Sequence, residues 1–117
     1  MPTTAELLAA NLHQVFGNRD AASRRAAIEA TYTDDVEFAD PEGVEIGLDA
    51  LEKKAASLID GAPTDFVFEE DGLAYTGPDA GALAWTFGPS GAPVARGIDL
   101  ITVRDGKIST LRTLLHQ

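Results

Sequence analysis

The spacing of apolar residues divides the chain into a helical first half and a β-rich second half. Thr3 followed by Glu6 matches a capping box, and apolar residues then recur every three or four positions until Gly17 ends the pattern. A second helix is predicted over 21–32, behind an aspartate that can cap it. A third is predicted over 48–59, because apolar residues line one face of that segment and charged residues the other.

From residue 65 onward the apolar period changes from about 3.6 residues to 2, which is typical of strands. A short strand at 36–38 precedes four longer ones, at 66–77, 81–88, 94–103 and 107–115. Asp105-Gly106, between two alternating runs, predicts a two-residue hairpin turn. Helices first and antiparallel hairpins afterwards predict an α+β fold in which three N-terminal helices cover one face of a curved sheet.

Composition narrows the classes of function. A chain of 117 residues with 44% hydrophobic and 24% charged residues is expected to form one domain, 1–117, around one core. The net charge of -10 disfavours nucleic acid and anionic membrane surfaces as partners. The absence of cysteine excludes thiolate chemistry, and two distant histidines predict no metal site. No targeting or membrane-spanning segment is recognised, so a cytoplasmic location is expected.

Asp99 lies on the apolar face of a predicted strand. Side chains alternate along 94–103, so Asp99 shares a face with Gly97 and Ile101. If this face meets the core, burial raises the pKa of Asp99, and a protonated carboxyl can donate a hydrogen bond to a developing oxyanion. The pattern also allows a buried acid satisfied by neighbouring hydroxyl or amide groups, or an opposite orientation that leaves Asp99 in solvent.

Asp40 follows a short apolar strand and precedes a proline. Alternation places Val36, Phe38 and Asp40 on one face, so Asp40 is expected to point inward at the rim of the interior. Pro41 restricts the backbone there, and a carboxylate held in this way suits a general base. The same Asp-Pro sequence is also typical of a turn in which the carboxylate accepts N–H groups of its own loop.

Several other residues are candidates to line or reach the interior between the helices and the sheet. His13 lies at the margin of the apolar stripe of the first helix, where it is either a proton shuttle or a partly exposed histidine with an ordinary hydrogen bond. The aromatic residues of the strands either fill the core or line a pocket. The expected lining residues of such a pocket are Phe16, Phe38, Trp85, Phe87 and Ile101.

Four segments together resemble a known family. In chain order they are "RRAAIEATY", "YTDDVEFADPEGVEIGLDAL", "WTFG" and "GIDLITVRDGKISTL". They resemble the nuclear transport factor 2-like superfamily, and within it the SnoaL-like group, which includes polyketide cyclases and is related to ketosteroid isomerase. The resemblance covers nearly the whole chain and implies a cone: a bent, mostly antiparallel sheet around an apolar pocket, often in a homodimer.

The resemblance also implies roles for both aspartates. Asp40 lies where ketosteroid isomerases have their general base, and Asp99 where that family has a protonated hydrogen-bond donor and the cyclases an acid/base aspartate. The isomerases also have a tyrosine on the first helix, which "NLHQVF" lacks. In an epoxide-hydrolysing branch an arginine lies two residues from the aspartate; here Arg96 is three away, on the opposite face. Arg112 on the last strand remains a candidate to reach the interior.

The leading hypothesis is therefore a cofactor-free isomerase, cyclase or dehydratase that acts on a small, apolar carbonyl compound. Asp40 would abstract a proton, and Asp99 together with His13 would stabilise the enolate or return the proton. The alternative is a non-catalytic module of the same fold that binds a hydrophobic ligand or forms a dimer. A third reading is a protein-binding role of the open sheet face, which exposed Leu or Phe side chains on the later strands would support.

Overall fold

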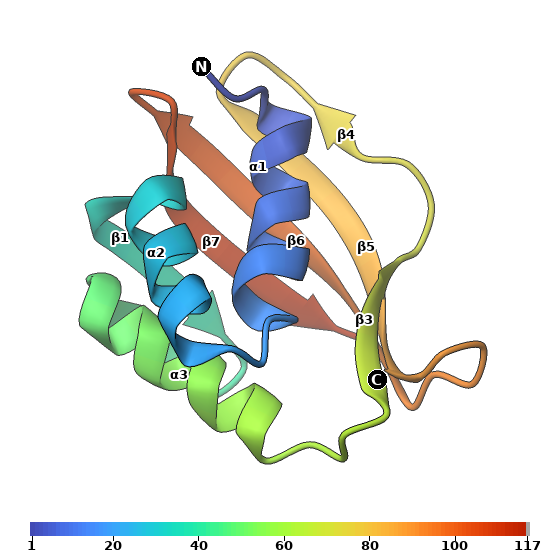
Figure 1. Cartoon of the computed structure of the whole chain (residues 1–117). Coiled ribbons are helices and arrows are strands. Elements are labelled where there is room, and N and C mark those ends of the chain that lie inside the picture. The colour runs from blue at the N-terminus through green and yellow to red at the C-terminus, as the bar shows by residue number, and fades with distance from the viewer. Residues whose placement is uncertain (117) are drawn as a thin grey trace.

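The structure, a computed structural model, describes residues 1–116. The helices are α1 (Thr4–Ala10), η1 (Asn11–Phe16), α2 (Ala21–Thr31) and α3 (Leu48–Asp60). The strands are β1 (Tyr32–Asp40), β2 (Gly43–Ile46), β3 (Phe66–Glu70), β4 (Tyr75–Thr76), β5 (Ala80–Pro89), β6 (Ala95–Arg104) and β7 (Lys107–Leu115). The helices gather on one side of the sheet (Figure 1). Within residues 1–116, every helix falls short of the length and apolar character that a bilayer span requires.

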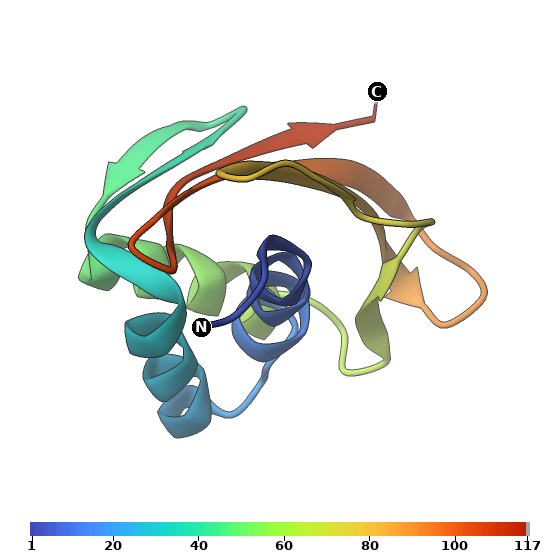
Figure 2. The ribbon, with the colours of Figure 1, turned by 90° about the horizontal axis from the view of Figure 1, so that it is seen from above.

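The strands form one curved sheet in the order β2-β1-β7-β6-β5-β3, and β4 pairs with β5. Neighbouring strands are antiparallel except β1 and β7, which are parallel. Figure 2 shows the sheet arching over the helices, which therefore cover its concave face. The predicted α+β architecture, a bent and mostly antiparallel sheet covered by helices, is confirmed.

The first helix changes geometry halfway along its length. Thr3 and Glu6 form the predicted capping box. From Asn11 the backbone widens into a π-helix, and the N–H of Gly17 donates to the carbonyl of Leu12, five residues back, at 2.8 Å. A Cβ at Gly17 would lie 2.8 Å from that same oxygen, so a glycine is needed at this end. The predicted first helix is therefore found up to Gly17, and its second half is a π-helix rather than an α-helix.

The strands differ from the prediction mainly in the middle of the chain. β1 begins at Tyr32, four residues before the predicted 36–38, and a further strand, β2, was not predicted. The predicted strand 66–77 is divided into β3 and β4, whereas 107–115 coincides with β7. The hairpin turn is confirmed, because Asp105 and Gly106 have φ of 55° and 76°.

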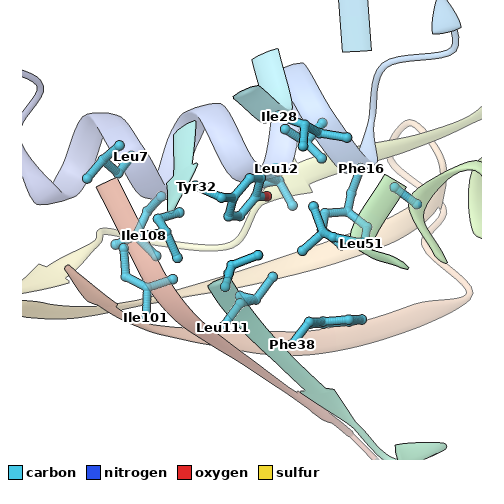
Figure 3. Packing of buried hydrophobic residues seen from close by; sticks show 14 of the residues in the cluster. Leu7, Leu12, Phe16, Ile28, Tyr32, Phe38, Leu51, Ile101, Ile108 and Leu111 are labelled. Carbon is cyan, nitrogen blue, oxygen red and sulfur yellow. The ribbon is translucent and has the colours of Figure 1, made fainter. Parts of the chain in front are cut away.

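The core joins the helices to the concave face of the sheet. Figure 3 shows Leu12 of η1, Ile28 of α2 and Leu51 of α3 gathered over the side chains of the sheet residues Phe38 and Leu111. Strand alternation in β6 is as predicted, since Gly97, Asp99 and Ile101 are buried and their neighbours face outward. Asp99 therefore lies under the helical layer rather than on the outer face of the sheet. Asp40, in line with the buried Phe38 of β1, lies on the same side.

Candidate functional site

A cavity of about 260 Å³ lies between the helical layer and the sheet. Its wall is apolar except for four residues, Asp40, Glu42, Asp99 and Thr113. Its aromatic residues are Phe16, Phe38, Phe68, Trp85 and Phe87. Four of the five predicted lining residues are thus found there. Ile101 is not, because it lies opposite Gly81 in the sheet, and at Gly81 the side chains of α1 approach the strand too closely to leave space.

The aromatic side chains form two groups in the wall. Phe68 stacks on Phe87 with ring centroids 4.2 Å apart and meets Trp85 edge to face at 5.2 Å. Phe16 and Phe38 contact one another at 5.6 Å. Rings packed in this way lose little further freedom when a flat apolar ligand enters, so the cavity favours such a ligand.

Asp99 lies in the cavity wall and is almost completely shielded, with 6% of its surface exposed. Its Oδ1 accepts hydrogen bonds from Trp85 Nε1 at 3.0 Å and Thr113 Oγ1 at 2.8 Å. Its Oδ2 accepts one from Asn11 Nδ2 at 2.9 Å. All three partners are donors, so they favour the ionised carboxylate.

Burial and hydrogen bonding act on Asp99 in opposite directions. Loss of water around the carboxyl raises its pKa, and the donors Thr113, Trp85 and Asn11 lower it. Burial has the larger effect, and the pKa of Asp99 rises to about 6. A carboxyl with this pKa is mostly ionised at neutral pH but can take up a proton at small cost.

Gly97 determines how Trp85 reaches Asp99. The two residues are opposite one another in the sheet, and a Cβ on Gly97 would lie 2.4 Å from Cζ2 of the Trp85 ring. The indole therefore lies across the glycine, with its N–H directed at Asp99. The space beside Asp99 that the missing side chain of Gly97 leaves is filled by the indole.

Asp40 is at the end of β1 and contributes to the same cavity, with 12% of its side chain exposed. Its Oδ2 forms an ion pair with Lys54 Nζ of α3 at 3.0 Å. Its Oδ1 accepts the N–H of Glu42 at 2.9 Å, which is the turn contact that the Asp-Pro sequence allows. Lys54 also pairs with Glu42, so the turn between β1 and β2 is tied to the helix. The two readings of Asp40 are therefore compatible: it stabilises a turn and also faces the cavity.

His13 and the two arginines lie away from the cavity wall. His13 is 45% exposed in its side chain and pairs with Glu70 of β3 at 2.8 Å. Arg96 faces outward and contacts Asp71, as alternation predicted. Arg112 is exposed, and its sheet partner Leu100 is exposed as well, so both are on the outer face. The candidate role of Arg112 in the interior is not supported.

The sequence reasoning missed the partners of both acids. Asn11 is fully buried, and its Oδ1 accepts a short hydrogen bond from the hydroxyl of Tyr32, which is also fully buried. Asn11 lies four residues after Leu7 and four before Val15, so its place in the apolar stripe was a readable signal. Lys54 had no such signal, because its contact depends on how α3 meets β1.

The described residues, 1–116, contain no group of three or more His, Asp or Glu side chains arranged to hold a metal ion. The polar groups of the cavity wall are the carboxyl groups of Asp40, Glu42 and Asp99 and the hydroxyl of Thr113, which suit proton transfer or hydrogen bonding to a polar atom of a ligand.

Comparison with known proteins gives the family context. The model of the SnoaL-like domain family matches residues 9–111. A comparison with curated protein sequences finds no match. Among solved structures, a protein from Agrobacterium tumefaciens assigned as an isomerase of the SnoaL-like family has a TM-score of 0.86 at 18% identity, covering 95% of both chains.

Two further structures are similar in fold. A protein from Sinorhizobium meliloti assigned as a polyketide cyclase has a TM-score of 0.73 at 16% identity, covering 97% of this chain and 95% of its own. A protein from Kribbella flavida assigned as a ketosteroid isomerase has a TM-score of 0.73 at 14% identity, covering 97% and 78%. At such identities the similarity establishes the fold, and function depends on the site.

Proposed function

Since the chain belongs to the SnoaL-like domain family, we propose that it binds a small, apolar carbonyl compound in its cavity and catalyses proton transfer on it with Asp99. The reaction class is that of an isomerase, cyclase or dehydratase. The observation that carries the proposal is a nearly dry carboxyl in the wall of an apolar cavity, with a pKa of about 6. Acid-base groups work best when their pKa lies near the working pH.

The size and lining of the cavity support a small ring compound as substrate. Its volume of about 260 Å³ is just below the range of pockets that enclose drug-sized ligands, roughly 300–1,000 Å³. The stacked rings of Phe68 and Phe87 offer a flat apolar surface. We therefore expect one or two fused rings with a single carbonyl group rather than a steroid-sized skeleton.

The proposed step moves one proton between two carbon atoms. The Asp99 carboxylate accepts the proton from the carbon next to the carbonyl, and the electron pair of that C–H bond forms an enolate. Protonated Asp99 then returns the proton to another carbon of the conjugated system. The three donors around Asp99 lower its pKa and burial raises it by more, so at a pKa of about 6 neither protonation state is strongly favoured near neutral pH.

Asp40 has a different role in this proposal from that of the general base, which the sequence suggested. Its Oδ2 forms an ion pair with Lys54 and its Oδ1 accepts the N–H of Glu42, so this carboxylate links the turn between β1 and β2 to α3. We propose that the Asp40–Lys54 pair closes one end of the cavity and orients the polar end of the substrate. His13 has no part in the proposal, because its ring pairs with Glu70 on the surface.

The proposal is tested by hydrogen exchange into a simple ketone. The protein is incubated with 2-cyclohexen-1-one in D₂O, and the loss of the proton signals next to the carbonyl is followed by NMR. Wild-type protein should accelerate exchange over buffer, and Asp99→Asn should abolish the acceleration. Asp65→Asn, at an exposed aspartate, is the matched control and should behave like wild type.

Binding is measured in parallel through Trp85, the only tryptophan of the chain, which lines the cavity. Its fluorescence should change on addition of the ketone. A change in fluorescence without any exchange above buffer would reject the enzyme and support the non-catalytic ligand-binding alternative. Equal exchange in wild type and Asp99→Asn would reject Asp99 as the proton carrier.

One observation also supports the expectation of a homodimer. Ile98 and Leu114 are opposite one another on the outer face of the sheet, and Leu100 lies beside them; all three are between 37% and 48% exposed. Exposed apolar side chains that adjoin on one sheet face are typical of a protein contact. We propose that a second copy of the chain covers this face, with the cavity on the opposite side of the sheet.

A further inference from the structure

Two buried polar side chains that are not part of the cavity wall connect Asp99 to strand β1. The hydroxyl of Tyr32, the first residue of β1, donates to Oδ1 of Asn11, the first residue of η1. The other end of the same amide donates from Nδ2 to Oδ2 of Asp99 at 2.9 Å. Figure 3 shows the Tyr32 ring, with its oxygen, among the apolar side chains of the core. The hydrogen-bond connection from Tyr32 to Asp99 therefore runs through Asn11.

The orientation of the Asn11 amide between Tyr32 and Asp99 depends on Tyr32. An amide can present either its N–H₂ group or its oxygen to a neighbour. Within residues 1–116, Asn11 is the sole hydrogen-bond partner of the Tyr32 hydroxyl. Turning the amide around would leave the buried Tyr32 O–H without an acceptor, which costs free energy. It would also place the Asn11 oxygen against the Asp99 carboxylate.

We propose that Tyr32 is a positioning residue for Asp99: its hydroxyl holds the Asn11 amide with the N–H group toward Asp99 and thereby sets how readily Asp99 takes up a proton. The catalytic meaning of this relay rests on the proposed function. The relay itself is a property of the folded chain and is testable without a substrate.

The surroundings of Asp99 leave few other groups that could have this effect. The elements packed against it present an amide from η1, an indole from β5 and a hydroxyl from β7. Of the titratable groups, Tyr32 stays neutral, because burial and then the charge of Asp99 raise its pKa well above the ordinary value. Asp40 and Glu42 line the same cavity. His13, although it is on η1, is directed to Glu70 at the surface.

Removing the Tyr32 hydroxyl should change Asp99 in a defined direction. In Tyr32→Phe the amide is free to turn, and its oxygen can then accept a hydrogen bond from protonated Asp99. Hydrogen bonding to the neutral form raises the pKa of a carboxyl, so the pKa of Asp99 should rise by about one pH unit, a tenfold change in proton affinity. The measurement is a pH titration of the Asp99 carboxyl carbon by NMR. Tyr75→Phe, at an exposed tyrosine, is the matched control.

The same titration shows whether the effect passes through Asn11. Asn11→Leu removes a donor from the carboxylate and should itself raise the pKa of Asp99. Because no amide is then left to turn, adding Tyr32→Phe to Asn11→Leu should cause no further rise. A Tyr32→Phe effect of equal size in both backgrounds would overturn the relay.

A measurement on the unmodified protein keeps the proposal falsifiable if these variants fold poorly. The ring carbon that carries the Tyr32 hydroxyl should shift in the NMR spectrum with the same midpoint as Asp99. A Tyr32 signal that stays constant while Asp99 titrates would refute the proposal, as would an unchanged Asp99 midpoint in Tyr32→Phe. Neither result depends on turnover. The relay can therefore be refuted while the proposed function stands, and the proposed function can be refuted while the relay stands.

Discussion

Replacing Asp99 with asparagine should make the stability of the protein less dependent on pH. The carboxyl has a pKa of about 6 in the folded chain against a reference value of 3.8. Below pH 3.8 it is neutral in both the folded and the unfolded state. Between 3.8 and 6 the unfolded chain loses the proton first, so folding becomes less favourable as the pH rises. Above pH 6 the full cost of burying the charge is present.

The magnitude follows from the size of the shift. About two pH units at 1.36 kcal/mol each correspond to roughly 3 kcal/mol above pH 6, a large part of the stability of a small domain. Only 6% of Asp99 is exposed, so solvent screening reduces this little. Asparagine has no charge, and any conflict of its N–H₂ group with the donors around it is the same at every pH.

The assay compares urea unfolding of wild type and Asp99→Asn at several values from pH 4 to pH 8. The free energy of unfolding of the variant minus that of wild type should increase by roughly 2–3 kcal/mol over this range. The increase should occur mostly below pH 6.5, and the control Asp65→Asn should show none of it. If the difference in the free energy of unfolding between the two proteins stays constant within about 0.5 kcal/mol over this pH range, the argument that burial raises the pKa of Asp99 is refuted. This limit is well below the roughly 1.36 kcal/mol that correspond to a pKa shift of one unit.

Three further predictions concern neighbouring contacts. Gly97→Ala should displace the Trp85 ring and destabilise the fold by about 1–3 kcal/mol; an unchanged tryptophan emission spectrum would contradict this. Lys54→Met leaves the mostly shielded Asp40 carboxylate without its ion-pair partner. The free energy of unfolding in urea should fall by about 1–2 kcal/mol, between the values for surface and buried ion pairs. Adding Asp40→Asn should recover most of this loss. Leu114→Lys should convert the proposed dimer to a monomer in light scattering, whereas a monomeric wild type at high concentration would exclude this sheet face as the dimer contact.

Local patterns were sufficient for the elements whose side chains alternate or repeat regularly. β7 and α3 have a clear apolar face, and both were found within one residue of their observed bounds. Alternation also placed Asp99 correctly on the buried face of β6, and it placed Asp40 in line with Phe38. In these cases the sequence alone indicated which acids face the interior.

The missed elements depend on contacts between distant parts of the chain. β2 is an edge strand of four residues, and its two apolar residues, Val44 and Ile46, are exposed and too few to define an alternating pattern. β1 begins early because Tyr32 pairs with Ile108 of β7, and a bulge follows before Glu37. Consecutive polar residues at that bulge conceal the strand. Asn11 could not be assigned to Asp99 for the same reason, because η1 and β6 meet only in the folded chain. Thr113 was missed because a register shift between Thr102 and Val103 in the predicted β6–β7 hairpin brings it opposite Asp99.

Asp99 combines an environment that opposes charge with contacts that favour it. A carboxyl that serves only as a protonated donor would be poorly served by three hydrogen-bond donors, because each of them stabilises the ionised form. A carboxylate with a purely structural role would be poorly served by burial in an apolar wall. With both the burial and the three donors present, the protonated and ionised forms of Asp99 are close in free energy near neutral pH. Asp99 can therefore accept a proton and return it at little cost in free energy to either form. This balance suits the acid/base role that the resemblance to the cyclases implies for Asp99 better than the stationary donor role that the resemblance to the isomerases implies.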